Sequence, residues 1–326
     1  FALNLQTKFG SDQESVLHVA ARNNHDQIVE LLLANGICVD EKDKSLRTPL
    51  HMAASKGSHN ATIILLANHA QVTATDVFGF SPLHLCIRGH HFDLANDMFL
   101  FNADINFKGS KGSSVLHDCM SRGDLQALQF LLNLPAQYRV LVNHKDDRSE
   151  TPLMKAVVGG HVKCVEYLLG KRSDIAVSAI TDRGQNVFHM CAQCTGENQK
   201  EMLDTLIQLV MKYPSYDKSK LQQLLNERDK TRGQTPLHLA VIYKNMAMIE
   251  GIHQVITTLG IDVNVADKNG NTPTHIAIVK YNNAKSADEA SEYQAIVKAL
   301  VSFGSALDWS VANKDNVTAQ QLYKSM

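Results

Sequence analysis

The chain has 326 residues, of which 44% are hydrophobic and 20% are charged, with 32 Lys and Arg residues against 33 Asp and Glu residues. The hydrophobic content is enough for a continuous core, and the balanced charge argues against general intrinsic disorder. A formal net charge of -1 also argues against a surface that binds nucleic acid over its whole extent. The length allows two or three globular domains or one long repeat array.

Six cysteines are spread along the chain, a density far below that of a disulfide scaffold, so we expect a reducing, intracellular setting. We predict a cytoplasmic protein, with the nucleus as an alternative. No run approaches the ~18 apolar residues of a membrane span, and no basic-then-apolar N-terminus indicates a signal peptide. Because Phe1 is not Met, we expect the chain to be a piece of a longer protein.

A four-residue string recurs along the chain, first as Ser15-Val16-Leu17-His18 and next as Thr48-Pro49-Leu50-His51. Further copies begin at residues 81, 114, 151, 186, 235 and 272, and a degenerate copy surrounds Thr318. Successive copies are 33, 33, 33, 37, 35, 49, 37 and 46 residues apart. Three successive spacings of 33 residues indicate an internal repeat.

The repeated string has the chemistry of a helix start. Its first residue is usually Thr or Ser, whose hydroxyl can accept a hydrogen bond from an unpaired amide at the helix N-terminus. Pro at the next position fits the first helical turn, where its missing N–H costs nothing. Gly57, Gly123 and Gly160 come nine residues after their caps, where the first helix should end. A second apolar helix, an extended segment and a turn such as Asp267–Gly270 complete the unit.

The period and the string together resemble the ankyrin-repeat family, from about residue 11 to residue 326. The resemblance implies an all-α solenoid of helix-turn-helix units that carry β-hairpin-like fingers. We predict one ankyrin-repeat domain over residues 1–326. Its repeats are predicted at 11–43, 44–76, 77–109, 110–146, 147–181, 182–230, 231–267, 268–313 and, as a partial repeat or cap, 314–326.

Three segments depart from the period. Residues 1–10 are typical of the end of an earlier unit. Residues 211–228 form an insert whose leucines at 221, 224 and 225 predict a short extra helix over 217–226. Residues 281–291 form a polar insert that we expect between the two helices of its repeat. Each insert is either part of a binding surface or a tolerated surface loop. We further predict that the interface beside Asn186, which lacks the usual Pro, is the weakest junction.

Fifteen histidines raise the question of metal or acid–base chemistry. Seven belong to the repeated string, where the resemblance implies hydrogen bonds to the backbone of neighbouring turns. His189, Cys191 and Cys194 come nearest to a metal cluster, but a lone Cys-x-x-Cys needs two further ligands for structural zinc. No catalytic motif of the H-E-x-x-H, P-loop or G-x-S-x-G type occurs. We therefore predict no metal, no cofactor and no enzyme activity.

The resemblance places a binding surface on the fingers and first helices, at positions that packing does not fix. Phe78 and Phe80 flank Gly79 at a fingertip and are either binding hot spots or packed on the adjacent finger. Basic residues recur on the fingers and favour an acidic peptide or protein face, although an ordinary solvated face fits equally well. The candidate partner-binding residues are Lys44, Arg47, Lys56, Phe78, Phe80, Arg88, Lys111, Arg122, Arg148, Arg183, Arg232, Tyr243 and Lys268.

We therefore predict a non-catalytic scaffold that binds protein partners, without direct nucleic-acid binding or membrane insertion. One alternative is the substrate-recruiting region of a larger enzyme, such as a ubiquitin ligase or a kinase. A second alternative is a regulator of a transcription factor, because residues 235–242 are similar to a stretch in inhibitors of NF-κB. The resemblance also implies hydroxylation as a candidate modification at Asn106, Asn143 and Asn264. The sequence specifies neither the partner nor the oligomeric state.

Overall fold

The structure, a computed structural model, describes residues 8–194, 196, 198–212 and 217–324. Residues 1–7 of the predicted earlier unit, 213–216 of the first predicted insert and the last two residues lie outside the described residues. Contacts within the chain group it into two compact units. Unit 1 comprises residues 1–119 and 124–147, and unit 2 comprises residues 120–123 and 148–326.

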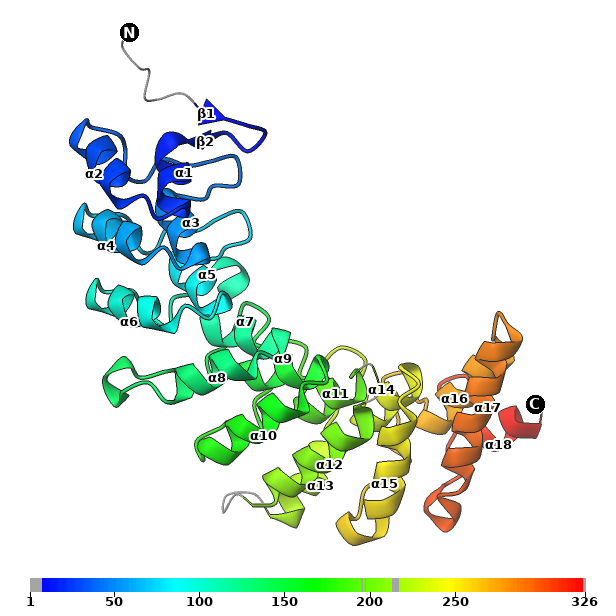
Figure 1. Ribbon diagram of the computed structural model, residues 1–326. Coiled ribbons are helices and arrows are strands. Elements are labelled where there is room, and N and C mark those ends of the chain that lie inside the picture. Colours follow the sequence, from blue (N-terminus) through cyan, green and yellow to red (C-terminus); the bar gives the residue numbers. More distant parts are fainter. Residues whose placement is uncertain (1–7, 195, 197, 213–216, 325–326) are drawn as a thin grey trace. The chain divides into compact units, whose positions relative to one another are not determined.

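Unit 1 begins with a short antiparallel hairpin, in which β1 (Lys8–Phe9) pairs with β2 (Glu14–Ser15). Helix pairs follow, with first helices α1, α3 and α5 in one layer and second helices α2, α4 and α6 in another (Figure 1). The bounds are α1 Val16–Arg22, α2 Asp26–Ala34, α3 Pro49–Lys56, α4 His59–Ala67, α5 Pro82–Arg88, α6 Phe92–Leu100, η1 Ser110–Gly112, α7 Val115–Arg122, α8 Leu125–Leu132 and η2 Ala136–Tyr138. The last turn of α7 is assigned to unit 2.

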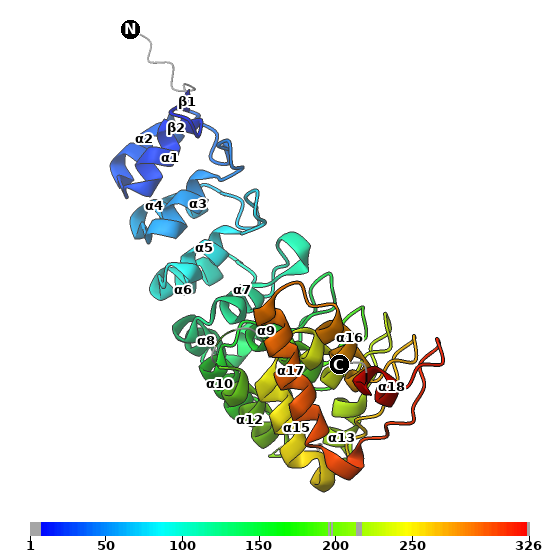
Figure 2. The same ribbon diagram turned by 90° about the vertical axis from the view of Figure 1, so that its right-hand side faces the viewer.

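Unit 2 repeats the same two layers. The first helices α9, α11, α14, α16 and α18 contact one another in order, and so do the second helices α10, α12, α15 and α17. Figure 2 shows α15 and α17 lying side by side. The bounds are α9 Pro152–Val158, α10 Val162–Lys171, α11 Val187–Ala192, α12 Gln199–Val210, α13 Lys218–Asn226, α14 Pro236–Ile242, α15 Met246–Leu259, α16 Pro273–Asn282, α17 Ala287–Val301, η3 Gly304–Ala306 and α18 Ala319–Lys324.

The first helices begin where the repeated string predicts. Thr48 has extended backbone angles, and its capping box with His51 satisfies amides that would otherwise lack partners at the start of α3. Pro49 occupies the first turn of that helix. Gly57 ends α3 with a left-handed φ of 67°, a conformation that costs glycine little. The all-α ankyrin fold predicted from the sequence is therefore confirmed.

The core of each unit lies between its two helix layers. The leucines of the repeated string, including Leu17, Leu50 and Leu83, are at most 1% exposed. Burying such a side chain contributes about 1.5–3 kcal/mol. Small residues such as Ala53 and Cys86, both fully buried, allow neighbouring helices to approach closely. A single repeat has no partner for these surfaces, so stability depends on the stacking of neighbours.

The two predicted inserts have different structures. The first contains the expected extra helix, α13, and Leu221, Leu224 and Leu225 are at most 1% exposed. The second was predicted as a polar segment between two helices, but it mostly lengthens them, since α16 continues to Asn282 and α17 begins at Ala287. Tyr293 of α17 is buried, so the polar residues of this segment form the outer faces of packed helices rather than a long loop.

The interface beside Asn186 is more firmly held than the sequence suggested. Asn186 is fully buried, and its side-chain oxygen accepts hydrogen bonds from the amides of Phe188 and His189. Its side-chain amide donates to the carbonyl of Leu224 at 2.8 Å and to the carboxylate of Glu227 at 2.7 Å. The insert that follows thus supplies partners for this cap, which argues against the predicted weak junction, and hydrogen exchange remains the test of that prediction.

Candidate functional site

A buried histidine joins most repeats to the next finger, the repeat with Met154 at this position being an exception. The Nδ1 atom of His51 accepts a hydrogen bond from the amide of Thr48 at 3.0 Å. Its Nε2 atom lies 3.0 Å from the carbonyl oxygen of Phe80 in the following finger. A carbonyl can only accept, so Nε2 carries the proton and donates. The same link joins His18 to Arg47, His189 to Gln234, His238 to Asn271 and His275 to Val317.

Burial keeps these histidines neutral. It lowers the pKa of His84, His189 and His238 to about 4, against an ordinary value of 6.5. The backbone carbonyl acceptors oppose this shift without cancelling it. A second proton on Nδ1 would face the amide of the cap, so the neutral tautomer is required. The motif histidines are therefore structural joints, as the resemblance implied, and they are not arranged around one reactive centre.

An acidic residue organises most finger turns. Asp43 accepts hydrogen bonds from the amides of Ser45 and Arg47, and Asp76 accepts them from Phe78 and Phe80. Asp229 and Asp267 do the same in unit 2. These carboxylates are buried and face their own turns. These four carboxylates therefore add little exposed negative charge, although Asp147 and Asp182 are exposed on other fingers.

Consecutive fingers are joined by single backbone hydrogen bonds. In unit 1, the amide of Val77 donates to the carbonyl of Ser45 at 3.0 Å. In unit 2, the amide of Lys230 donates to Arg183, and the amide of Lys268 donates to Arg232, both at 2.8 Å. This ladder fixes the spacing of the fingers, so their tip residues recur at regular intervals along each unit.

The fingers and first helices of unit 2 line two adjoining clefts of about 350 and 400 Å³. Arg183 and Gln185 line both clefts, which makes them continuous. We name this surface the arginine groove. Its lining residues are Ser121, Arg148, Glu150, Lys155, Val158, Gly159, Thr181, Asp182, Arg183, Gln185, Met190, Gln193, Asp229, Thr231, Arg232, Gln234, Leu239, Ile242 and Tyr243.

The arginine groove brings together four of the residues predicted for partner binding, namely Arg148, Arg183, Arg232 and Tyr243. The side chains of Arg183 and Arg232 are exposed and form no ion pair within the described part of the chain. Buried Gln185 and Gln234 contribute polar groups to the lining without charge. The groove is therefore polar, open and positively charged at its fingertips.

Internal pairs compensate some of the other charges near the groove, while Asp182 remains exposed in its lining. Lys155 binds Glu150, so neither contributes a net charge to the surface. Burial favours the protonated form of Asp229, but hydrogen bonds from the amides of Arg232 and Gln234 outweigh it and lower the pKa of this carboxyl. Lys244, next to Tyr243, binds Glu292 of α17 and lies over the ring of Tyr293 at 5.2 Å. The first half of α17 thus packs beside the end of the groove.

The remaining predicted residues of unit 2 lie outside the groove lining. Lys268 is an exposed fingertip residue whose Nζ atom donates to the carbonyl of Lys230 on the preceding finger. Arg122 ends α7 and is exposed. Sequence reasoning missed the contributions of Gln193 and Val158 at the ends of their first helices. Their position just before the inter-helix turn was the available signal.

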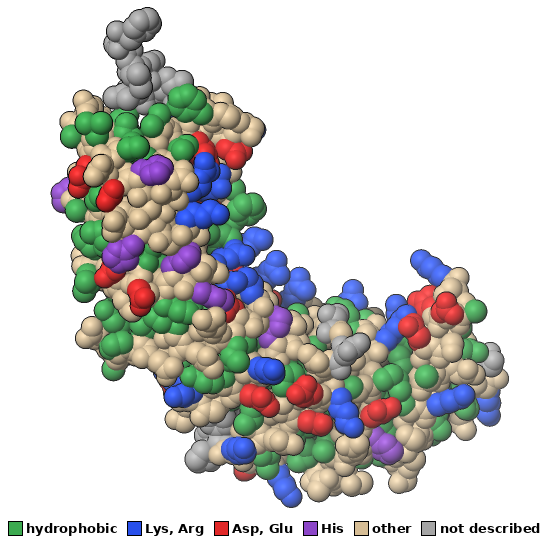
Figure 3. All heavy atoms as spheres, viewed as in Figure 1, with side chains coloured by type: hydrophobic (Ala, Val, Ile, Leu, Met, Phe, Trp, Pro, Cys, Tyr) green, Lys and Arg blue, Asp and Glu red, His purple; other side chains and the backbone are tan. Residues whose placement is uncertain are grey.

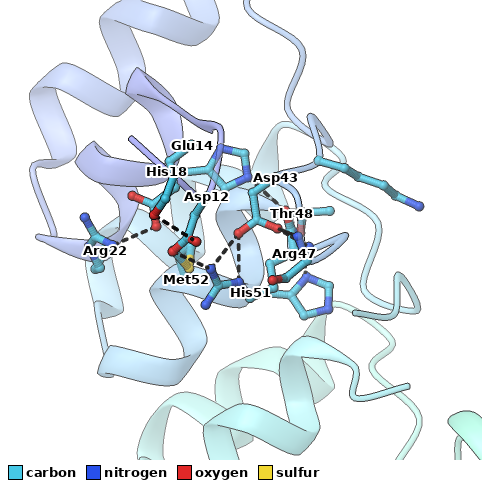
Figure 4. A network of polar contacts seen from close by, with 12 residues as sticks. Asp12, Glu14, His18, Arg22, Asp43, Arg47, Thr48, His51 and Met52 are labelled. Atoms are coloured by element: carbon cyan, nitrogen blue, oxygen red, sulfur yellow. Dashed lines mark hydrogen bonds and ion pairs between the residues drawn. The ribbon is translucent and has the colours of Figure 1, made fainter. Parts of the chain in front are cut away.

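The predicted residues of unit 1 differ widely in how much they are free to bind. Arg47 is held by Asp43 at 2.7 Å and approaches Asp12 at 3.8 Å (Figure 4). Lys44, Lys56 and Lys111 are exposed, and Figure 3 shows Lys and Arg side chains along the finger side of this unit. Arg88 lies over the ring of Phe80 at 4.6 Å.

The two predicted fingertip aromatics have different environments. Phe80 is partly buried between Arg88 and His84, and the ring centroids of Phe80 and His84 are 5.9 Å apart. Phe78 is 70% exposed. Sequence reasoning missed its neighbour Leu46, which is 45% exposed at the fingertip position that glycine occupies in the next finger. The departure from glycine at this position was the signal that could have identified Leu46.

The cysteine–histidine cluster does not have the chemistry of a metal site. Cys191 and Cys194 are buried, and burial raises the pKa of both thiols, which disfavours the thiolate that zinc requires. His189 already uses both ring nitrogens. Among the described residues, no group of three or more His, Cys, Asp or Glu side chains is placed to hold a metal ion. In the same part of the chain, no helix is long and apolar enough to cross a membrane.

Comparison with known proteins supports the repeat assignment. A family model of three ankyrin repeats matches residues 2–76 and 116–217, and a single-repeat model matches residues 232–268. The chain is 36% identical over 84 residues to protein fem-1 homolog A-like of Mus musculus. The matched segment covers 26% of this chain and 12% of that protein. It is 40% identical over 67 residues to protein fem-1 homolog A of Homo sapiens, or 21% of this chain and 9% of that protein.

The matched segments span only about a tenth of these relatives, so the likeness concerns their repeats and not the whole proteins. The family models, in contrast, cover more than half of the chain. Ankyrin repeats are protein–protein interaction modules. On the evidence of its repeated string, its stacked helix pairs and these matches, the chain belongs to the ankyrin-repeat family.

Proposed function

We propose that the chain is a non-catalytic scaffold that binds an acidic segment of a partner protein in the arginine groove. The observation that carries the proposal is the recurrence of Arg183 and Arg232 on adjacent fingers, with no carboxylate of the described residues paired to either. The fingers are held in register by the hydrogen bond from Lys230 to Arg183. The two charges therefore recur at a fixed spacing along the groove.

The chemistry of the arginines suits carboxylates. A guanidinium presents several donors in a fork that matches a carboxylate, and it stays charged at any physiological pH. Tyr243, 52% exposed at the end of α14, offers a ring and a hydroxyl next to these charges. Rim charges of this kind mainly raise the association rate and set specificity. The groove thus favours an extended peptide rich in Asp and Glu over a neutral or basic one.

The proposal is tested by fluorescence anisotropy with a short labelled peptide rich in Glu, Asp and Tyr. We expect Arg183→Glu/Arg232→Glu to weaken binding by roughly tenfold or more, because reversal replaces attraction by repulsion. The matched control is Lys163→Glu/Lys298→Glu, which makes the same charge change on exposed residues of the second helices α10 and α17.

The control double variant should bind like the unmodified chain. Binding by the unmodified chain should also weaken as salt rises, since the contacts are exposed and screened. The proposal is wrong if a peptide with Lys and Arg in place of the acidic residues binds equally well. It is also wrong if no acidic peptide binds, or if both double variants weaken binding alike.

We also propose that the protein works in a reducing compartment inside the cell. All six cysteines carry free thiols, and Cys38 is exposed. Burial raises the pKa of Cys86 to about 12, which keeps that thiol protonated and unreactive. Imaging of the tagged full-length protein tests this assignment, and a secreted protein would contradict it.

A further inference from the structure

Leu46 occupies a backbone position that its side chain disfavours. Its φ is +60°, in the left-handed region, where a bulky residue is a genuine outlier. In the other eight fingers the corresponding position, two residues before the cap, holds Gly in five and Gln13, Ser149 and Asn316 in the rest, so leucine is the only aliphatic residue among these described positions. Gly79, at this position in the next finger, has a φ of +80°. A leucine here costs stability that glycine would not.

Burial does not compensate this cost. Leu46 is 45% exposed, whereas a leucine that stabilises the fold is normally buried. Strained residues of this kind persist mainly where they serve function, so the strain directs attention to what surrounds it. On the adjacent finger, Val77 is 52% exposed and Phe78 is 70% exposed. The amide of Val77 donates to the carbonyl of Ser45, which places the two fingertips directly side by side.

Leu46, Val77 and Phe78 therefore form an exposed apolar patch on two neighbouring fingertips of unit 1, which we name the fingertip patch. Two lysines are exposed around it, whereas Arg47 is paired with Asp43 and lies 3.8 Å from the exposed Asp12. Asp43 has a fully buried side chain, and Asp76 is 7% exposed, because both carboxylates bind the amides of their own turns. Lys44 is exposed beside Leu46, and Lys111 is exposed on the third finger.

We propose that the fingertip patch binds a peptide segment in which one aliphatic or aromatic anchor is flanked by Asp or Glu. The anchor would contact Phe78, Val77 and Leu46, and the carboxylates would face Lys44 and Lys111. Phe78 supplies a large apolar surface, a side-chain type enriched in binding hot spots and interface cores. Leucine at the glycine position extends the apolar area from the finger of Val77 and Phe78 onto the preceding finger. The site lies in unit 1 and does not depend on the arginine groove.

The test uses two labelled peptides that share an acidic sequence, one with a central Phe and one with Ser in its place. Anisotropy titrations compare the unmodified chain with Leu46→Gly, Phe78→Ser and Ser149→Gly. Ser149 lies at the same position in another finger and has a φ of +59°. Its replacement by glycine therefore relieves backbone strain of the same kind away from the fingertip patch. It is the matched control for Leu46→Gly.

We expect the Phe peptide to bind the unmodified chain about tenfold more tightly than the Ser peptide, and Phe78→Ser to abolish this difference. Leu46→Gly should reduce the preference about fivefold while leaving the thermal unfolding midpoint unchanged or higher. Ser149→Gly should keep the full preference. Because Phe78 is exposed and glycine suits position 46, both test variants should fold.

Other outcomes overturn the proposal. Equal binding of the Phe and Ser peptides would show that the patch takes no apolar anchor. An equal loss in Ser149→Gly would trace the effect to finger flexibility rather than to the patch. A chain that self-associates in sedimentation experiments, and becomes monomeric in Phe78→Ser, would identify a second copy as the occupant instead of an acidic peptide.

Discussion

The two units use the same repeat in different ways. In unit 1 the repeated strings stay 33 residues apart, the helices are at most nine residues long, and the variation lies at the fingertips. In unit 2 the spacing is irregular, α15 and α17 reach 14 and 15 residues, and α13 is an added helix. Unit 1 thus presents apolar tips, and unit 2 presents a groove lined by arginines.

The difference shows which parts of the repeat can change. The insertions in the described part of unit 2 lengthen helices or add one after the second helix, while the caps and the finger ladder keep the geometry seen in unit 1. The energy of a repeat array lies in the interfaces between neighbours, so changes that spare those interfaces are tolerated. The predictions below test what the units share and where they differ.

The largest effect is expected from acidification, because both units depend on neutral histidines. The pKa of His84 in unit 1, and of His189 and His238 in unit 2, is about 4 when folded and near 6.5 when unfolded. The unfolded state therefore binds more protons between these values. Stability should be constant above about pH 7 and fall between pH 6.5 and 4, by about 1–2 kcal/mol per histidine at pH 5.

Chemical denaturation monitored by circular dichroism at pH 7.5, 6 and 5 measures this loss. His189→Gln should be less stable at pH 7.5, by about 1–3 kcal/mol, but should lose less on acidification than the unmodified chain. His253→Gln, which changes an exposed histidine outside the repeated string, is the control variant. A stability that stays flat down to pH 4 would contradict the neutral-histidine joints.

The second effect concerns the added helix, which only unit 2 has. Leu221→Ala should destabilise unit 2 by about 2–5 kcal/mol, because it empties a fully buried position. Leu100→Ala in unit 1 is the control, since Leu100 is 74% exposed and its loss should change stability by less than about 0.5 kcal/mol. If equilibrium unfolding shows equal effects, the insert is a passive loop.

The third effect concerns the close approach of fingers. A Cβ on Gly79 would lie 1.9 Å from the Cβ of Ser110 and 2.2 Å from its amide nitrogen, and the φ of Gly79 is +80°. Gly79→Ala should cost about 2–3 kcal/mol through this clash and the backbone strain. Gly36→Ala shares the positive φ, at +77°, but meets nothing within 4 Å, so about 1 kcal/mol is expected. If thermal unfolding shows that Gly79→Ala and Gly36→Ala lose similar amounts of stability, the two fingers can move apart to accommodate the added methyl group.

The smallest effect compares the caps of the two units. Thr48→Ala should cost about 1 kcal/mol, the usual value of a helix cap. Asn186→Ala should cost about 1 kcal/mol more, because the Asn186 side chain also bonds to Leu224 and Glu227. Hydrogen exchange should then show α11 as well protected as α14, and preferential exchange in α11 of the unmodified chain would restore the original prediction of a weak junction there.

Most of the fold could be predicted from the sequence because capping and period are local signals. The string around Thr48 encodes the start of α3, and the leucines at 221, 224 and 225 encode α13. The form of the second insert could not be predicted, because its residues are polar and carry no apolar period, and only the bounds of α16 and α17 show that they extend two helices.

Less of the candidate site could be predicted. Periodicity identified the finger positions of Arg183 and Arg232. It could not show that Arg47 forms an ion pair with Asp43, because that contact depends on the rotamer of one long side chain. It also treated Phe78 and Phe80 as equivalent, although Arg88 covers only Phe80. Leu46 lay outside the predicted set, because its departure from glycine is visible in the sequence but the strain of its backbone angle appears only in the structure.

The histidine joint has a consequence for how such a chain can change over evolutionary time. His51 binds the main-chain carbonyl of Phe80, an atom that every amino acid carries. The joint therefore accepts any residue at that position and places no demand on its side chain. Fingertips can diversify, and whole repeats can be duplicated or exchanged, without a matching substitution in the neighbour. The hydrogen bonds that join neighbouring repeats therefore do not depend on the fingertip side chains that bind partners.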